Sequence, residues 1–331
     1  SKHLFQHQTI RTLATVVEPV RALLADQSAV VGAVPLSPIQ HWFFSQPLVA
    51  PHDWNQSVLF ELHQSLTLED VQTIFRSLLV HHDGLRSTFQ KQGTTWSQIS
   101  MAPEELEETL PCQLIDVPPS SESEQNQIIT KTVNALQASL DLTEGPLVRL
   151  VLFNLEGPGA RQRFLFMVHR LVIDRFSWQI LLTDFQSLFH QRLQDKPFTL
   201  PPKTSSFQQW TQRLQAYADN LPSENYQRLP SQAPLPVDFP KGENTVALSH
   251  TVTVSLDLGE TESLLLQVPS VYHTHIIDVL LTALGQAYTN WTGHSCLLID
   301  LESQEREASF EDVDVSRTIG WFTSLAPVLL D

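Results

Sequence analysis

The chain has 331 residues, of which 42% are hydrophobic, and its 36 Asp+Glu against 20 Lys+Arg leave a formal net charge of −16. An acidic chain without a Lys/Arg-rich run excludes nucleic acid and anionic membranes as main partners, and no apolar run reaches the roughly eighteen residues of a membrane span. The two cysteines, Cys112 and Cys296, favour a reducing, cytoplasmic compartment over a disulfide framework or a metal site.

Helices and strands are mixed along the first two thirds of the chain. From hydrophobic periodicity we expect helices at 8–25, 38–44, 68–82, 124–139, 177–192 and 205–219, and strands at 57–62, 85–89, 95–99, 112–117, 148–154 and 163–168. Ser37 and Thr67 are predicted N-caps. The string His81-His82-Asp83-Gly84 is interpreted as a helix C-terminus, with Gly84 as the stop and the imidazoles at the negative end of the helix dipole.

A proline-rich stretch at 221–240 is predicted to connect two lobes. Beyond it we expect a strand at 247–256, helices near 260–268 and 275–291, and strands at 296–301 and 324–329. This mixture predicts an α/β fold built of layers.

Four strings of residues carry more information than the elements. They are PLSPIQHWFF (35–44) with WNQS (54–57); HRLVIDR (169–175) with Ser177-Trp178; VDFP (237–240) with ENT (243–245); and DLE (300–302), Arg306-Glu307 and SRTIGWFT (316–323). In this order and spacing they resemble the epimerization domains of nonribosomal peptide synthetases, which belong to the condensation-domain superfamily. The resemblance covers about residues 30–331. Residues 1–15 resemble the end of a peptidyl carrier domain.

The resemblance implies two lobes, each like chloramphenicol acetyltransferase. The expected domains are the end of a carrier domain with a linker (1–27), an N-terminal lobe (28–220), an inter-lobe connector (221–245) and an incomplete C-terminal lobe (246–331). It also implies an aminoacyl or peptidyl thioester as substrate, carried on the phosphopantetheine arm of a peptidyl carrier domain, with no cofactor or metal of its own. Adjacent synthetase modules are the other implied partners.

Catalytic roles come from the same resemblance. In the family, the second His of H-H-x-x-x-D-G and the first Glu of E-G-H-G-R-E move the Cα proton. Here His169 matches the first, structural His, and Arg170 stands at the place of the second. Asp174 is retained and is expected to hold the loop by an internal ion pair or hydrogen bonds, and Glu302 is retained as the candidate catalytic carboxylate.

A tunnel for the thioester arm is also implied, and we expect its walls to include Arg175, Ser177, Trp178 and Trp321. Arg175 replaces the glycine of the first motif, so its side chain is expected to intrude on the tunnel and its backbone to lose freedom. The residues 303–305 replace Gly, His and Gly of the second motif.

Arg170 cannot act as a base near neutral pH, because the pKa of a guanidinium exceeds about 12. Three roles stay open for it: hydrogen bonds to an enolate, an ion pair with Glu302, or an ion pair with Asp174. For Glu302 the alternative is a solvated residue in a charged loop.

Several functions therefore stay open. The first is an epimerase-type domain that is catalytically impaired by Arg170. The alternatives are an active epimerase that relies on Glu302, a non-catalytic module that recruits a tailoring enzyme such as a haem-thiolate oxygenase, and an inactive scaffold.

Overall fold

The computed structural model describes residues 25–157, 161–222, 235–243, 245–304, 306 and 310–331. The chain divides into two compact units, Ser1–Leu221 with Gln304–Ser324, and Pro222–Ser303 with Leu325–Asp331. Segment 304–324 therefore belongs to the first unit, although most of the second unit precedes it in sequence. The helix expected at 8–25 falls almost wholly outside the described residues, and so does much of the connector.

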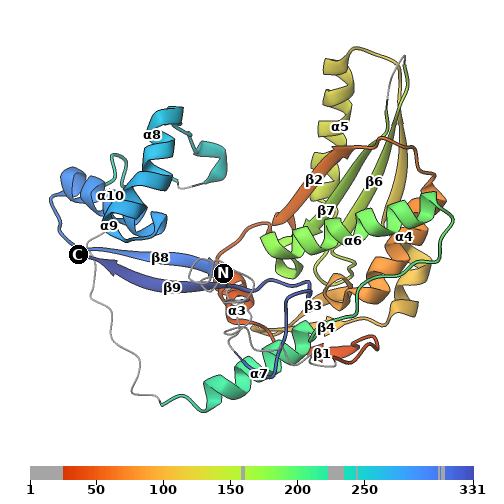
Figure 1. Cartoon of the computed structure of the whole chain (residues 1–331), viewed down its shortest axis with the longest axis horizontal. Helices are drawn as coiled ribbons and strands as arrows, with labels where there is room; N and C mark the ends of the chain where they lie inside the picture. The colour runs from red at the N-terminus through yellow and green to blue at the C-terminus, as the bar shows by residue number, and fades with distance from the viewer. Residues whose placement is uncertain (1–24, 158–160, 223–234, 244, 305, 307–309) are drawn as a thin grey trace, which may run out of the picture. The chain divides into compact units, whose positions relative to one another are not determined.

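The main sheet of the first unit has four strands. They are β2 (Asn55–Glu61), β7 (Arg163–His169), β6 (Val148–Leu155) and β5 (Cys112–Val117), in that order across the sheet (Figure 1). The pairs β2–β7 and β7–β6 are antiparallel, whereas β5 runs parallel to β6. The parallel pair is possible because helix α5 (Glu122–Gln137) lies between β5 and β6 in sequence and supplies the crossover.

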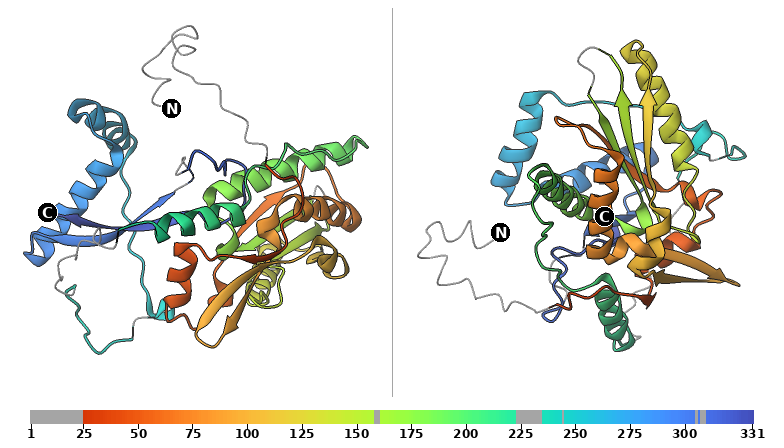
Figure 2. Two further views of the ribbon diagram at one scale, coloured as in Figure 1. Left: turned by 90° about the horizontal axis from the view of Figure 1, so that it is seen from below. Right: turned by 90° about the vertical axis from the view of Figure 1, so that its right-hand side faces the viewer.

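Helices cover both faces of this sheet. Helices α4 (Leu68–His81) and α6 (Arg175–Leu193) cover one face, and α5 covers the other (Figure 2). Along β7, Phe164 stacks on a ring of α6 and Phe166 meets a ring of α4 edge-to-face, while Leu165 and Met167 pack in the cluster beneath α5. The strand is buried on both sides, which explains its continuous apolar run.

A smaller antiparallel sheet consists of β1 (Gly32–Val34), β4 (Thr95–Ser100) and β3 (Ser87–Gln92). Around the two sheets lie α3 (Pro38–Ser45), α7 (Phe207–Asp219) and the short 3-10 helices η1 (Pro51–Asp53), η2 (Asp83–Arg86), η3 (Pro103–Thr109) and η4 (Arg170–Val172). A separate apolar cluster joins α7 and β1 to the segment 310–322. Its buried members are Val34, Phe207, Trp210, Val315 and Phe322.

Most predicted helix starts are confirmed, but one predicted stop is wrong. Ser37 and Thr67 are the N-caps of α3 and α4, and Thr67 accepts a hydrogen bond from the backbone N–H of Asp70. Helix α4 ends at His81, with His82 as an extended C-cap, and Gly84 lies in η2 instead of ending the helix. Gly84 serves close approach, because a Cβ there would lie 2.6 Å from the carbonyl oxygen of Ile319.

The second unit contains η6 (Val246–Leu248), α8 (Leu258–Glu262), a π-helical turn η7 (Ser263–Gln267), α9 (Val268–Tyr272) and α10 (Ile276–Thr292). Strands β8 (Leu297–Gln304) and β9 (Thr323–Leu330) pair with each other. The strand expected at 247–256 is wrong: residues 249–256 are exposed and form no ladder with the described strands. Alternating side chains favour a strand, but the strand also needs a partner for its backbone groups.

No single helix of the described chain is long and apolar enough to cross a membrane. The stretch Leu258–Tyr272 and helix α10 pass that test only when taken together, across a bend of 100°.

Candidate functional site

The motif at 169–175 forms the turn from the buried strand β7 into helix α6. His169 is the last residue of β7, η4 covers Arg170–Val172, and Asp174 is the N-cap of α6. The Asp174 carboxylate accepts a hydrogen bond from the backbone N–H of Ser177 at 2.7 Å, as expected for an Asp cap. The local sequence therefore places the motif at the end of a rigid strand.

His169 is fully buried and both of its ring nitrogens are engaged. Nε2 lies 2.9 Å from the carbonyl oxygen of Pro51 and Nδ1 lies 3.1 Å from the backbone nitrogen of Leu171. Because a carbonyl only accepts and an N–H only donates, the ring is the neutral Nε2–H tautomer. Burial lowers the pKa of His169 to about 4. This agrees with the structural role expected for His169.

Asp174 forms a buried ion pair with Arg306. The guanidinium of Arg306 lies 3.0 Å from Oδ1 and 3.4 Å from Oδ2 of the carboxylate, and the backbone N–H of Phe322 donates to Oδ2 at 3.2 Å. Arg306 also donates to the carbonyl oxygens of Val315 and Thr318. The ion-pair partner of Asp174 is thus Arg306, a residue for which the sequence predicted no role, and the pair Arg170–Asp174 stays a prediction.

Ser177 connects the same helix to Gly320. Its hydroxyl donates to the carbonyl oxygen of Gly320 at 2.9 Å, and it lies within hydrogen-bond distance of the N–H of Gly320 and of the Arg306 guanidinium. The side chain is completely buried. Its hydrogen-bonding capacity is thus used within the first unit, to tie α6 to the Gly-Trp-Phe string.

Arg170 is half-buried, and its guanidinium lies over two indole rings. The guanidinium carbon is 5.7 Å from the ring centre of Trp54 and 5.6 Å from that of Trp321. Phe43 packs against both indoles. A cation over two aromatic faces is attracted by the negative ring faces, so this site favours a permanent cation. The sequence placed Trp54 in one of the four strings but predicted no contact for it.

Arg175 is exposed and occupies the first position of α6 with a helical backbone. Among the described non-glycine residues, positive φ occurs only at Asp195 and His273. The helical backbone at Arg175 is one that any residue adopts, so this conformation does not require glycine. The intrusion of its side chain on a tunnel stays a prediction.

The other residues expected in the tunnel pack inside the first unit. Trp178 is 8% exposed and donates its indole N–H to the side-chain oxygen of Gln56 at 2.8 Å, and Trp321 is 2% exposed. Their part in a tunnel stays a prediction.

Glu302 lies on strand β8 of the second unit, with an exposed side chain. The alternative that it belongs to a loop is wrong. Its neighbours Ser303 and Gln304 continue the strand, and Glu305 lies outside the described residues. The catalytic role of Glu302 stays a prediction.

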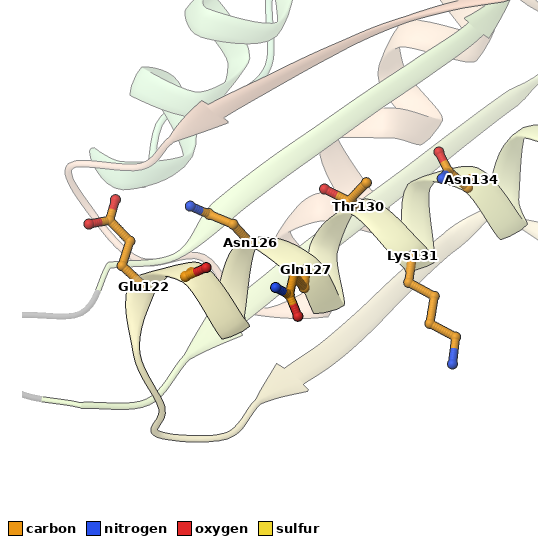
Figure 3. A pocket seen from close by; sticks show the side chains of 7 residues that line it. Glu122, Asn126, Gln127, Thr130, Lys131 and Asn134 are labelled. Atoms are coloured by element: carbon orange, nitrogen blue, oxygen red, sulfur yellow. The ribbon is translucent and has the colours of Figure 1, made fainter.

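A shallow hollow follows α5, away from this motif. It is lined by Glu122, Ser123, Asn126, Gln127, Thr130, Lys131 and Asn134 (Figure 3). All of these residues come from one helix, so the hollow has no opposing wall that would enclose a ligand.

The first unit thus combines a helix-covered α/β sheet, a His-Arg turn at the end of a central strand, and an Asp-capped helix after the turn. The protein-family model with the description "Condensation domain" matches residues 30–331 of this chain. The chain belongs to the condensation-domain family of nonribosomal peptide synthetases.

Two large synthases are similar to this chain over its whole length. It is 43% identical to a subunit of the linear gramicidin synthase of Brevibacillus parabrevis and 37% identical to the chondramide synthase of Chondromyces crocatus. The chain spans only 4% and 8% of these two proteins.

Among solved structures, the epimerization domain from the third module of tyrocidine synthetase B matches with a TM-score of 0.81 and 33% identity. The match covers 93% of this chain and 70% of that one. The X-domain in complex with OxyB from teicoplanin biosynthesis matches with a TM-score of 0.71 and 20% identity, over 92% of this chain and 67% of that one, which shows a shared fold. The expected α/β fold and the resemblance to epimerization domains are both confirmed.

Proposed function

We propose that this domain binds an aminoacyl or peptidyl thioester on a carrier domain and is impaired as an epimerase, because Arg170 stands at the place of the second His. The proposal draws on the 33% likeness to an epimerization domain. Inversion at Cα needs a base on one face of the carbon and an acid on the other. A guanidinium stays protonated and cannot supply the base.

The other groups of the turn do not replace the missing imidazole. The lone pair on Nδ1 of His169 accepts the Leu171 N–H, and its Nε2–H is committed to Pro51. Asp174 is buried against Arg306 and accepts two backbone N–H groups. Arg306 and these two N–H groups occupy both oxygens of the carboxylate, which is committed to holding the turn. Glu302 is then the carboxylate left for proton transfer.

The remaining components of the proposal follow from the family. The phosphopantetheine arm of a peptidyl carrier domain presents the substrate, and the domain uses no cofactor of its own. Its partners are that carrier domain and adjacent synthetase modules in the cytoplasm.

Hydrogen exchange at Cα tests the proposal directly. A carrier domain loaded with an L-aminoacyl group is mixed with this protein in D₂O, and deuterium at Cα is measured by mass spectrometry after hydrolysis of the thioester. Loss of a general acid/base costs about 10²–10⁴-fold in rate, so we expect exchange lower by that factor than with an epimerization domain that has both histidines. Exchange at an equal rate would refute the impairment.

The matched variants separate the alternatives. If the wild-type chain exchanges rapidly and Glu302→Gln abolishes exchange, the domain is an active epimerase that relies on Glu302. If Arg170→His with Arg175→Gly recovers exchange, the domain is an impaired epimerase whose remaining groups are in place.

A second candidate function is a non-catalytic module that recruits a tailoring enzyme. It is favoured by the number of altered positions, since Arg170, Arg175 and residues 303–305 all depart from the family motifs. The two indole rings beside Arg170 also stabilise a permanent cation at the place where the family has an imidazole. We expect the double variant to stay inactive and the wild-type chain to retain a tailoring enzyme in a pull-down. Recovery of exchange together with no retained enzyme would exclude this candidate.

A further inference from the structure

Three metal-ligating side chains converge in the first unit, apart from the motif at 169–175. They are His81 at the end of α4, His82 at its C-cap, and Asp184 on α6. One ligand atom from each lies within 4.8 Å of the others. Nε2 of His82 is 3.0 Å from Oδ2 of Asp184, and the two imidazole rings are 4.7 Å apart and nearly perpendicular.

Each ligand is held differently. Asp184 is 1% exposed, and the guanidinium of Arg317 donates a hydrogen bond to its Oδ1 at 2.5 Å. The arginine therefore fixes the direction of the carboxylate, while Oδ2 faces His82. Hydrogen bonds of this kind from neighbouring residues commonly orient metal ligands. His82 is 4% exposed, so its ring cannot rotate far from the carboxylate.

The imidazole of His81 is held less firmly than the side chains of His82 and Asp184. It contacts the ring of His82, but no described residue forms a hydrogen bond with its imidazole. It borders a cavity of about 20 Å³, also lined by Lys203 and Thr204, which has room for one water molecule.

We propose that His81, His82 and Asp184 bind a divalent metal ion of the zinc class, with a water molecule as the fourth ligand. Two imidazoles and one carboxylate with an open position form the donor set of zinc sites that keep a solvent ligand. Ligand bonds of roughly 2.0–2.2 Å place the ligand atoms about 3.3 Å apart in a tetrahedron. The pair His82–Asp184 needs to open by only a few tenths of an ångström, and His81 turns toward it.

The local charges determine how strong such a site can be. Three cations lie beside these ligands and face only two carboxylates: Arg317 pairs with Asp184, whereas Lys203 and Arg86 share Asp83. A metal ion therefore meets one carboxylate in surroundings of net positive charge, so we expect affinity below that of structural zinc sites with several thiolates. The competing interpretation is a purely structural network of His82, Asp184 and Arg317, in which His81 takes no part.

Metal titration distinguishes the two. The full chain is treated with a chelator, dialysed, and titrated with Co²⁺ while the visible ligand-field bands are recorded; Zn²⁺ is then added as a competitor. We expect one equivalent of Co²⁺, bands of a tetrahedral or five-coordinate ion, and displacement by Zn²⁺. His81→Gln should weaken binding at least about tenfold, because it removes a ligand and leaves the His82–Asp184–Arg317 network in place.

His190→Gln is the matched control. His190 is an exposed helical histidine on α6. Its ring lies within hydrogen-bond distance of the carbonyl oxygen of Gln186 and contacts the ring of Phe189, and it is not one of the three proposed ligands, so its loss should leave Co²⁺ binding unchanged. Equal binding by the wild-type chain and the His81→Gln variant would overturn the site, and so would the absence of saturable binding in the wild type. Unfolding curves of both variants show whether either change acts through the fold.

Discussion

His169 and Arg170 are neighbours in sequence with opposite surroundings. His169 lies in the core, where its two nitrogens complete backbone hydrogen bonds. The Arg170 guanidinium lies over the rings of Trp54 and Trp321, which favour a cation. One residue along the chain thus separates a site that requires a neutral ring from a site that suits a permanent charge.

His169 should make the stability of the first unit depend on pH. Its pKa is about 4 in the folded chain, below the ordinary value of 6.5, because burial disfavours the charged ring. The unfolded chain therefore binds the proton first, so the stabilisation is fully present above pH 6.5 and is lost as pH falls toward 4. One such group contributes about 1.4 kcal/mol per pH unit in this window, or about 3 kcal/mol in all.

Urea unfolding of the wild-type chain and His169→Gln at several pH values measures this contribution. The free energy of unfolding of the variant should fall less steeply with decreasing pH, by about one bound proton. Identical slopes would show that His169 titrates normally in the folded chain.

Asp174 should be the most costly charge to remove from the motif. Asp174→Asn leaves the buried guanidinium of Arg306 without a counter-charge, which typically costs about 3–5 kcal/mol. The exposed pair Arg213–Asp312 provides the control: Asp312→Asn should cost less than about 1 kcal/mol. Chemical denaturation of the two variants gives both values, and similar small losses would contradict a structural role for the Asp174 pair.

At the scale of elements, the segment 310–322 is held against α6 and α7 by close approach as well as by charge. Gly320 lies between Ser177 and Phe207, and a Cβ added to it would lie only 2.3 Å from the Phe207 ring. The glycine of the Gly-Trp-Phe string is thus required by space, since its φ is not in the left-handed region.

Gly320→Ala should therefore destabilise the first unit by about 1–3 kcal/mol, as overpacking does. Gly285→Ala is the control within a helix, because a Cβ there would meet only Leu330 at 3.9 Å. Alanine in place of a mid-helix glycine should stabilise α10 by up to about 1 kcal/mol. Thermal unfolding followed by circular dichroism compares them, and an unchanged melting temperature for Gly320→Ala would contradict the close packing.

At the scale of the whole molecule, the first unit is discontinuous in sequence. Val315 and Phe322 complete an apolar cluster with Val34, Phe207 and Trp210, and the arginines of the same segment neutralise two carboxylates on α6. Residues 25–221 alone would lack Arg306 beside Asp174, Arg317 beside Asp184, and two members of the apolar cluster.

A fragment of residues 25–221 should therefore unfold without a cooperative transition and should bind a hydrophobic dye. A synthetic peptide of residues 304–324 should bind to the fragment and restore part of the transition. Calorimetry of the fragment with and without the peptide checks this. A cooperative transition at the same temperature as the full chain would show that the segment is dispensable.

The sequence alone was sufficient to predict the features that depend on residues close to one another along the chain. Hydrophobic period and cap residues located most helices and strands, because backbone preferences act within a few residues. Four strings in order identified the epimerization-type family. They also identified Arg170, since a missing imidazole is visible in the sequence itself.

Only the tertiary structure showed the contacts between residues that are far apart along the chain. It paired Asp174 with Arg306 across 132 positions and joined Ser177 to Gly320 across 143. It also showed that Arg175 begins a helix without strain, and that residues 249–256 find no strand partner among the described residues. The physical reason is that ion pairs, close contacts and strand ladders depend on which segments the packed core brings together, and a spacing along the chain carries no record of that.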